Sequence, residues 1–66
     1  MTQQFMRLRD VRAATGLAPS TIYRLIRLKR FPPPIKILGP RTSRWASNEI
    51  GDWQAARIAE RDGMAS

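Results

Sequence analysis

The segment 16–30 constrains the fold more than any other part of the chain, because it predicts one helix with two chemically opposite faces. At about 100° per residue, Ile22, Leu25 and Ile26 fall on one side of this helix. The other side is polar and basic, and it carries Ser20, Tyr23, Arg24 and Arg27. One face therefore requires a hydrophobic core, whereas the other is suited to an anionic partner.

The surroundings of this helix predict a helix-turn-helix. Residues 9–15 form a shorter helical pattern that ends at Gly16, so the connecting turn is short and contains glycine. Beyond the longer helix, the prolines of 32–34 lack backbone donors and stop it near Arg30. The longer helix is therefore expected over about residues 19–30, where it would serve as a recognition helix.

The start of the longer helix depends on its first turn. Pro19 suits the first helical position, where a missing N–H costs nothing, and this makes Ala18 the N-cap. Alanine is a poor cap, so a start at Ser20 or Thr21 is the alternative. In either case the first turn offers hydroxyl and free N–H groups that can bind a phosphate.

A hairpin follows the prolines. Residues 35–38 are β-like, 39–42 carry turn residues, and 43–45 can return as a second strand. Such a hairpin, a wing over about residues 35–45, is marginal alone and must pack against the helices.

A third helix is expected after the wing. Ser47 or Asn48 can cap it, and it is expected to end near Arg61, ahead of Gly63. The predicted fold class is therefore mainly α with a small β-hairpin, arranged as a winged helix-turn-helix.

The length of 66 residues predicts one small domain, over 5–61, with flexible termini at 1–4 and 62–66. The chain has no Cys and no His, which excludes disulfides, ordinary zinc sites and a histidine-based triad. Its five carboxylates accompany no phosphate loop or nucleophile motif, so we expect no enzyme, no cofactor and no metal. Without a secretory signal or a membrane-spanning apolar run, a soluble cytoplasmic protein with no membrane partner is expected.

The large apolar residues of the helices and of the second strand have the spacing of a core. They are Ile22, Leu25, Ile26, Trp45, Ile50 and Trp53. Tryptophan can also stack on exposed bases. In so small a domain, however, two tryptophans are better suited to provide the main packing mass.

Charge is distributed unevenly along the chain. Twelve Lys and Arg against five Asp and Glu give a net charge of +7. Residues 1–48 contain ten of these cations and one anion, whereas 49–66 contain two cations and four anions. The basic charge thus coincides with the helix-turn-helix and the wing, which favours duplex DNA as the partner.

Several side chains of the longer helix and the wing are candidate DNA contacts. Arg24 and Arg27 can reach guanine O6 and N7, and Tyr23 can contact a phosphate or a thymine methyl. Arginines at the wing tip suit a phosphate backbone or a minor groove. The full set is Ser20, Thr21, Tyr23, Arg24, Arg27, Arg30, Arg41, Thr42, Ser43 and Arg44.

Each of these assignments has a structural alternative. The helix face can be an ordinary solvated basic face, and Tyr23 can be a half-buried packing residue. Arg44 can pair with Glu49 or Asp52, which would remove it from the DNA contacts. Arg30 near the helix C-terminus is stabilising there without any ligand.

Several motifs resemble the AlpA family of small prophage-type regulators, which are related to MerR-like and excisionase winged-helix domains. The resemblance covers about residues 5–60. It rests on Arg-Leu-Arg-Asp-Val at 7–11, Thr-Gly-Leu-Ala-Pro-Ser-Thr-Ile-Tyr-Arg-Leu-Ile at 15–26, Phe-Pro-Pro-Pro-Ile-Lys-Ile at 31–37, Ser-Arg-Trp at 43–45 and Glu-Ile-Gly-Asp-Trp at 49–53. Members usually have a capping residue before the second helix, where this chain has Ala18 and Pro19.

The resemblance implies that the second helix enters the major groove and that the wing touches the flanking backbone. It implies transcriptional control of prophage or mobile-element genes, or an excisionase role in which the protein bends attachment-site DNA for an integrase. A third hypothesis is a protein-binding module that presents the acidic third helix to integrase or RNA polymerase. Without a heptad helix for dimerisation, we expect a monomer in solution that assembles cooperatively on DNA.

Overall fold

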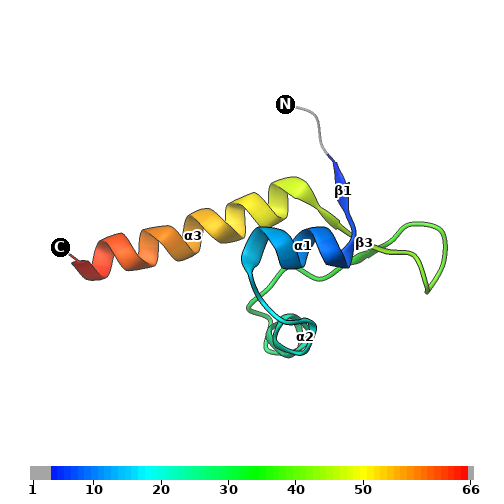
Figure 1. Cartoon of the computed structure of the whole chain (residues 1–66), viewed down its shortest axis with the longest axis horizontal. Coiled ribbons are helices and arrows are strands. Elements are labelled where there is room, and N and C mark those ends of the chain that lie inside the picture. The colour runs from blue at the N-terminus through cyan, green and yellow to red at the C-terminus, as the bar shows by residue number, and fades with distance from the viewer. Residues whose placement is uncertain (1–3, 66) are drawn as a thin grey trace.

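The computed structural model describes residues 4–65. Its elements follow the chain in the order β1 (Phe5–Met6), α1 (Leu8–Thr15), α2 (Pro19–Arg27), β2 (Ile35–Lys36), β3 (Ser43–Ala46) and α3 (Ser47–Ala65). Figure 1 shows α1 in the centre with α2 below it, α3 extending to one side and the turn between β2 and β3 projecting to the other. This arrangement confirms the predicted winged helix-turn-helix.

The turn between α1 and α2 depends on Gly16. Its φ of 73° lies in the left-handed region that favours glycine, and its N–H donates to the Arg12 carbonyl at 2.7 Å. Ala18 is the N-cap of α2 and Pro19 is its first helical residue. The first of the two predicted helix starts is therefore confirmed, and the later start at Ser20 is wrong.

The end of α2 lies at Arg27, three residues before the predicted end near Arg30. Lys29 adopts a left-handed φ of 59°, and its N–H donates to the Ile26 carbonyl at 3.0 Å. The Arg30 N–H donates to the Leu25 carbonyl at 2.8 Å. These two bonds form a Schellman motif, which turns the chain away from the helix before the prolines are reached.

The sheet has three antiparallel strands in the order β1-β3-β2, where the sequence predicts a two-stranded hairpin. In β1, Phe5 pairs with Ala46 and Met6 pairs with Trp45. In β2, only 35–36 are extended, because the chain turns before it completes the predicted strand over 35–38. A two-residue strand such as β1 has no periodicity of its own, so nothing in the sequence marks it.

Ser47 ties β1 to the junction of β3 and α3. Its hydroxyl accepts a hydrogen bond from the Gln4 N–H at 3.0 Å, and its own N–H donates to the Gln4 carbonyl at 2.8 Å. Ser47 is one of the two predicted N-caps, but in the structure it is the first residue within α3. Its two hydrogen bonds to Gln4 hold the N-terminal strand against the start of this helix.

The end of α3 lies at Ala65, so the predicted end near Arg61 is wrong. Gly63 lacks the positive φ that Gly16 has, and it continues the helix instead of stopping it. Glycine in a helix costs about 1 kcal/mol relative to alanine but ends a helix only when it turns left-handed. Of the predicted flexible termini, 62–65 are helical, whereas 1–3 and 66 lie outside the described residues.

The core lies where the three helices meet β3. Its buried apolar residues are Val11, Ile22, Phe31, Trp45, Ala46 and Ile50. The prediction is confirmed for Ile22, Trp45 and Ile50, while Leu25, Ile26 and Trp53 pack half-buried at its margin. The burial of Trp45 leaves it unable to serve as an exposed platform for bases.

Both tryptophan indoles hold the segment that follows α2. Trp45 Nε1–H donates to the Pro32 carbonyl at 2.9 Å, and Trp53 Nε1–H donates to the Arg30 carbonyl at 2.8 Å. Between these carbonyls, Phe31 enters the core, and its ring meets Trp53 edge-on with centroids 4.9 Å apart. The two indoles thereby fix the end of α2 against β3 and α3.

Replacement of each tryptophan by phenylalanine keeps a ring and removes the N–H. Because Trp45 is 1% exposed, Trp45→Phe leaves the Pro32 carbonyl without its donor and opens a gap in the core. We expect its free energy of unfolding to fall by about 2 to 3 kcal/mol. Trp53→Phe should cost about 1 kcal/mol, because water can reach the exposed Arg30 carbonyl. Urea denaturation followed by circular dichroism measures both, and equal losses would contradict this ordering.

Lys29 offers a second test, of the left-handed helix end. Because glycine adopts a positive φ without steric cost, Lys29→Gly should raise the free energy of unfolding by about 1 kcal/mol relative to Lys29→Ala. The alanine variant is the matched control, since both substitutions remove the charge. Thermal denaturation of the two variants would contradict the assignment if their stabilities were the same.

Candidate nucleic-acid interface

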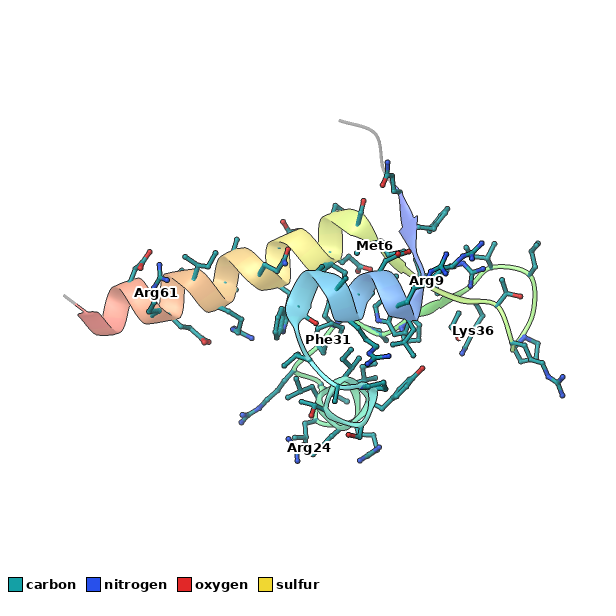
Figure 2. All side chains as sticks on the ribbon, in the orientation of Figure 1. Met6, Arg9, Arg24, Phe31, Lys36 and Arg61 are labelled. Atoms are coloured by element: carbon teal, nitrogen blue, oxygen red, sulfur yellow. The ribbon has the colours of Figure 1, made fainter. Side chains whose placement is uncertain are left out.

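The solvent-facing side of α2 gathers four of the predicted contact residues. Ser20, Tyr23, Arg24 and Arg27 are all exposed, at the helical spacing i, i+3, i+4 and i+7, while Ile22 is fully buried on the opposite side. Tyr23 keeps 41% of its surface exposed rather than packing into the core. Figure 2 shows Arg24 on the lower side of α2, pointing away from the rest of the molecule. This group forms the recognition face of α2.

The first turn of α2 borders a shallow depression formed with α1. Arg9, Arg12 and Ala18 are among the residues that line it, and both arginines are exposed. The N–H groups in the first turn of a helix have no acceptor within the helix, so they suit an anion. Arg9 and Arg12 bring two cations to the depression that ends at the N-cap of this helix. Neither arginine is among the contacts predicted from the sequence, although their i, i+3 spacing places them on one face of α1.

The wing carries the remaining predicted contacts. Arg41 is exposed, whereas Thr42, Ser43 and Arg44 are half-buried. Arg44 Nη1 donates to the Ser43 carbonyl at 2.8 Å, and Lys36 Nζ donates to the Ser43 hydroxyl. The alternative in which Arg44 pairs with an acidic residue of α3 does not occur among residues 4–65. Lys36, a cation that the sequence analysis did not select, thus lies beside the predicted contacts.

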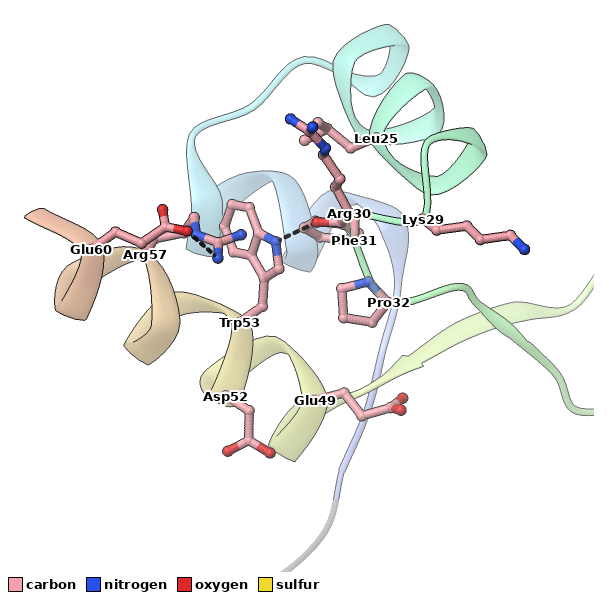
Figure 3. Close-up of a pocket in the computed structure, with 10 residues that line it drawn as sticks. All are labelled: Leu25, Lys29, Arg30, Phe31, Pro32, Glu49, Asp52, Trp53, Arg57 and Glu60. Carbon is pink, nitrogen blue, oxygen red and sulfur yellow. Dashed lines mark hydrogen bonds and ion pairs between the residues drawn. The ribbon is translucent and has the colours of Figure 1, made fainter.

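Arg30 lies beyond the end of α2, at the third position after Arg27. It is one of the residues that line a groove between the end of α2 and α3, and Figure 3 shows its side chain extending beside Leu25 of α2. The groove also contains Trp53, and the Arg57 guanidinium lies over this indole, 5.4 Å from the ring centroid. The prediction from the sequence groups Arg30 with Arg27 because it continues the helix unbroken to about residue 30. In the structure α2 ends at Arg27, so helical spacing no longer relates Arg30 to Arg27.

Ion pairs divide the molecule into two electrostatic parts. The salt bridges among residues 4–65 are Arg57–Glu60 at 2.8 Å and Arg61–Asp62 at 2.9 Å, both within α3. The cations of α1, α2 and the wing have no such partner within that range. Their charge is therefore available to an external polyanion such as a phosphate backbone, and the charges of α3 are largely compensated internally.

No helix in the described part of the chain is long and apolar enough to cross a membrane. A family model described as Prophage CP4-57 regulatory protein (AlpA) matches residues 4–58. The chain is also 42% identical over 59 residues to an uncharacterized protein, ORF88, of Enterobacteria phage P4. This alignment covers 89% of the chain and 66% of the phage protein, slightly less than two thirds of its length. No solved structure gives a significant match.

Proposed function

Because this chain belongs to the AlpA family of prophage regulatory proteins, we propose that it is a sequence-specific, double-stranded DNA-binding regulator of a prophage or mobile element. The coarser description, a phage-related regulatory DNA-binding protein, is that of the family. The observation that carries the finer proposal is the recognition face of α2, whose arginines have no ion-pair partner within residues 4–65. The proposal includes no enzymatic step, cofactor or metal.

In the proposed complex, α2 lies in the major groove. Arg24 and Arg27 are long enough to bind guanine O6 and N7 with both guanidinium nitrogens, and Tyr23 lies beside them. Ser20 and the first turn of α2 bind a phosphate, which fixes the position of the helix along the duplex.

Two further groups of cations flank α2 in this complex. Arg9 and Arg12 of α1 bind the backbone on one side of the groove, and Arg41 of the wing binds the backbone or the minor groove on the other. One small domain makes few base contacts, so we propose that several copies assemble on repeated sites.

A recombination role is the second candidate, because the wing projects from the body and can act on DNA beside the major-groove site. An excisionase bends attachment-site DNA so that an integrase proceeds toward excision. To distinguish the two functions, the extent of excision by the integrase of the same element is measured with and without this protein. Stimulated excision supports the recombination role, whereas control of a reporter promoter without stimulation supports regulation alone.

Selection of binding sites from a random duplex library tests the proposed function directly. We expect enrichment of one sequence motif and protection of that motif in a footprint. Recovery of no motif would overturn the proposal. The acidic-helix hypothesis predicts a different outcome, namely that substitution of Arg24 and Arg27 leaves function intact.

Arg24→Ala should weaken binding to the selected site by about 1 to 3 kcal/mol and relax the sequence preference at one position. Arg61→Ala is the matched control, because Arg61 is an exposed arginine that is paired with Asp62 on α3. We expect this control to bind nearly as tightly as the natural chain. Fluorescence anisotropy with the selected duplex and with single-base variants measures both effects. Equal losses in the two variants would place the interface elsewhere.

Binding should also weaken steeply with salt. If about four to six phosphates are neutralised, the slope of log K against log salt lies between about −3.6 and −5.4. Arg12→Ala should make this slope less steep by about one, because it removes a single phosphate contact without touching base recognition. A slope near zero would contradict a DNA-binding role.

A further inference from the structure

The wing tip exposes an apolar side chain. Leu38 is 84% exposed, more than any other large apolar residue described, and Leu28 follows at 58%. A single exposed leucine is ordinary on a protein surface. Here, however, Ile35 and Ile37, which precede Leu38 on the first arm of the wing, are exposed as well. Ile35, Ile37 and Leu38 therefore lie outside the core cluster of the protein.

The backbone holds Leu38 in a closed turn. The Ile37 N–H donates to the Thr42 carbonyl at 3.1 Å, and the Thr42 N–H donates to the Gly39 carbonyl at 3.2 Å. Gly39 has a φ of 124°, which side chains other than glycine rarely adopt, and the Pro40 ring restricts its own φ. Leu38 thus precedes a turn whose shape is fixed before any partner binds.

The charges around this tip favour DNA over an apolar protein partner. Arg41 lies in the turn, Lys36 lies two residues before Leu38, and Arg44 pairs directly opposite Ile35. Residues 34–48 contain no Asp or Glu. In Figure 2, Lys36 extends from the wing toward the same lower side as Arg24 of α2. An apolar tip within a ring of cations matches the minor groove, where arginine and lysine are attracted and small apolar wedges insert between base steps.

We propose that the wing tip is a minor-groove wedge: Leu38, backed by Pro40, inserts between two adjacent base pairs and kinks the duplex. Arg41 and Lys36 bind the phosphates on either side of the inserted step. This inference rests on the proposed function, because α2 must lie in the neighbouring major groove to bring the wing to the DNA. Its consequence is that the protein bends its site as well as recognising it.

The test measures bending and binding separately on a short duplex that carries the selected site and a fluorophore at each end. We expect energy transfer between the ends to rise when the natural chain saturates the duplex. Leu38→Ala should lose roughly half or more of this rise, because alanine is too short to separate two bases. Its affinity should fall by less than about tenfold, since the lost apolar burial is offset by the unstacking that no longer occurs. Its salt slope should not change, because no charge is removed.

Two further variants keep the result interpretable. Ile58→Ala also truncates an exposed aliphatic residue, but on α3, and it should bend the duplex as the natural chain does. Leu38→Met keeps a long apolar side chain and should retain most of the bend. A 2-aminopurine base placed at each step beside the α2 site should brighten at one step with the natural chain and stay dark with Leu38→Ala.

Equal bending by Leu38→Ala and the natural chain would overturn the wedge and leave the proposed function standing, since the duplex is still bound at its selected site. Loss of the bend in Ile58→Ala to the same extent would also overturn it. Failure of the library to yield any site is a separate result, which would remove the proposed function itself.

Discussion

Two hydrogen bonds from tryptophan indoles hold the segment on which the remaining geometry depends. The chain after α2 passes through three prolines and belongs to neither a helix nor a strand, so its carbonyls lack regular backbone partners. Trp53 satisfies the carbonyl of Arg30 and Trp45 satisfies that of Pro32, one from α3 and one from β3. Phe31 is buried between them. These contacts fix the end of α2 and the beginning of the wing relative to each other. The proposed complex, in which both contact one duplex, requires such a fixed arrangement.

Local sequence determines the parts of the fold that could be predicted. The two faces of α2, the glycine turn before it and the turn at the wing tip each depend on residues a few positions apart. The parts that could not be predicted depend on distant residues. β1 is defined only by its pairing with β3, some forty residues later, and the burial of Phe31 depends on two indoles from other elements. The end of α3 was missed for a different reason, since Gly63 carries no local sign of which φ it adopts.

The candidate interface divides in the same way. Helical spacing alone places Ser20, Tyr23, Arg24 and Arg27 together, and the structure brings them to one exposed face. Arg9 and Arg12 line a shallow depression together with Ala18, the N-cap of α2, and this arrangement depends on how the turn after α1 is folded. Arg30 lies outside α2 because a lysine takes the left-handed position that glycine usually occupies at a helix end.

The pairing of β1 with β3 has a consequence for the order in which the domain can form during synthesis. The backbone hydrogen bonds of α1 and α2 join residues that are close in the chain, whereas those of β1 join it to a distant strand. β1 emerges before them and has no partner until residues 43–47 have been made. During that interval its backbone groups remain open to other chains. The domain is therefore most exposed to aggregation while its wing is being translated, and the same strand, β3, ends that period when it pairs on both of its edges.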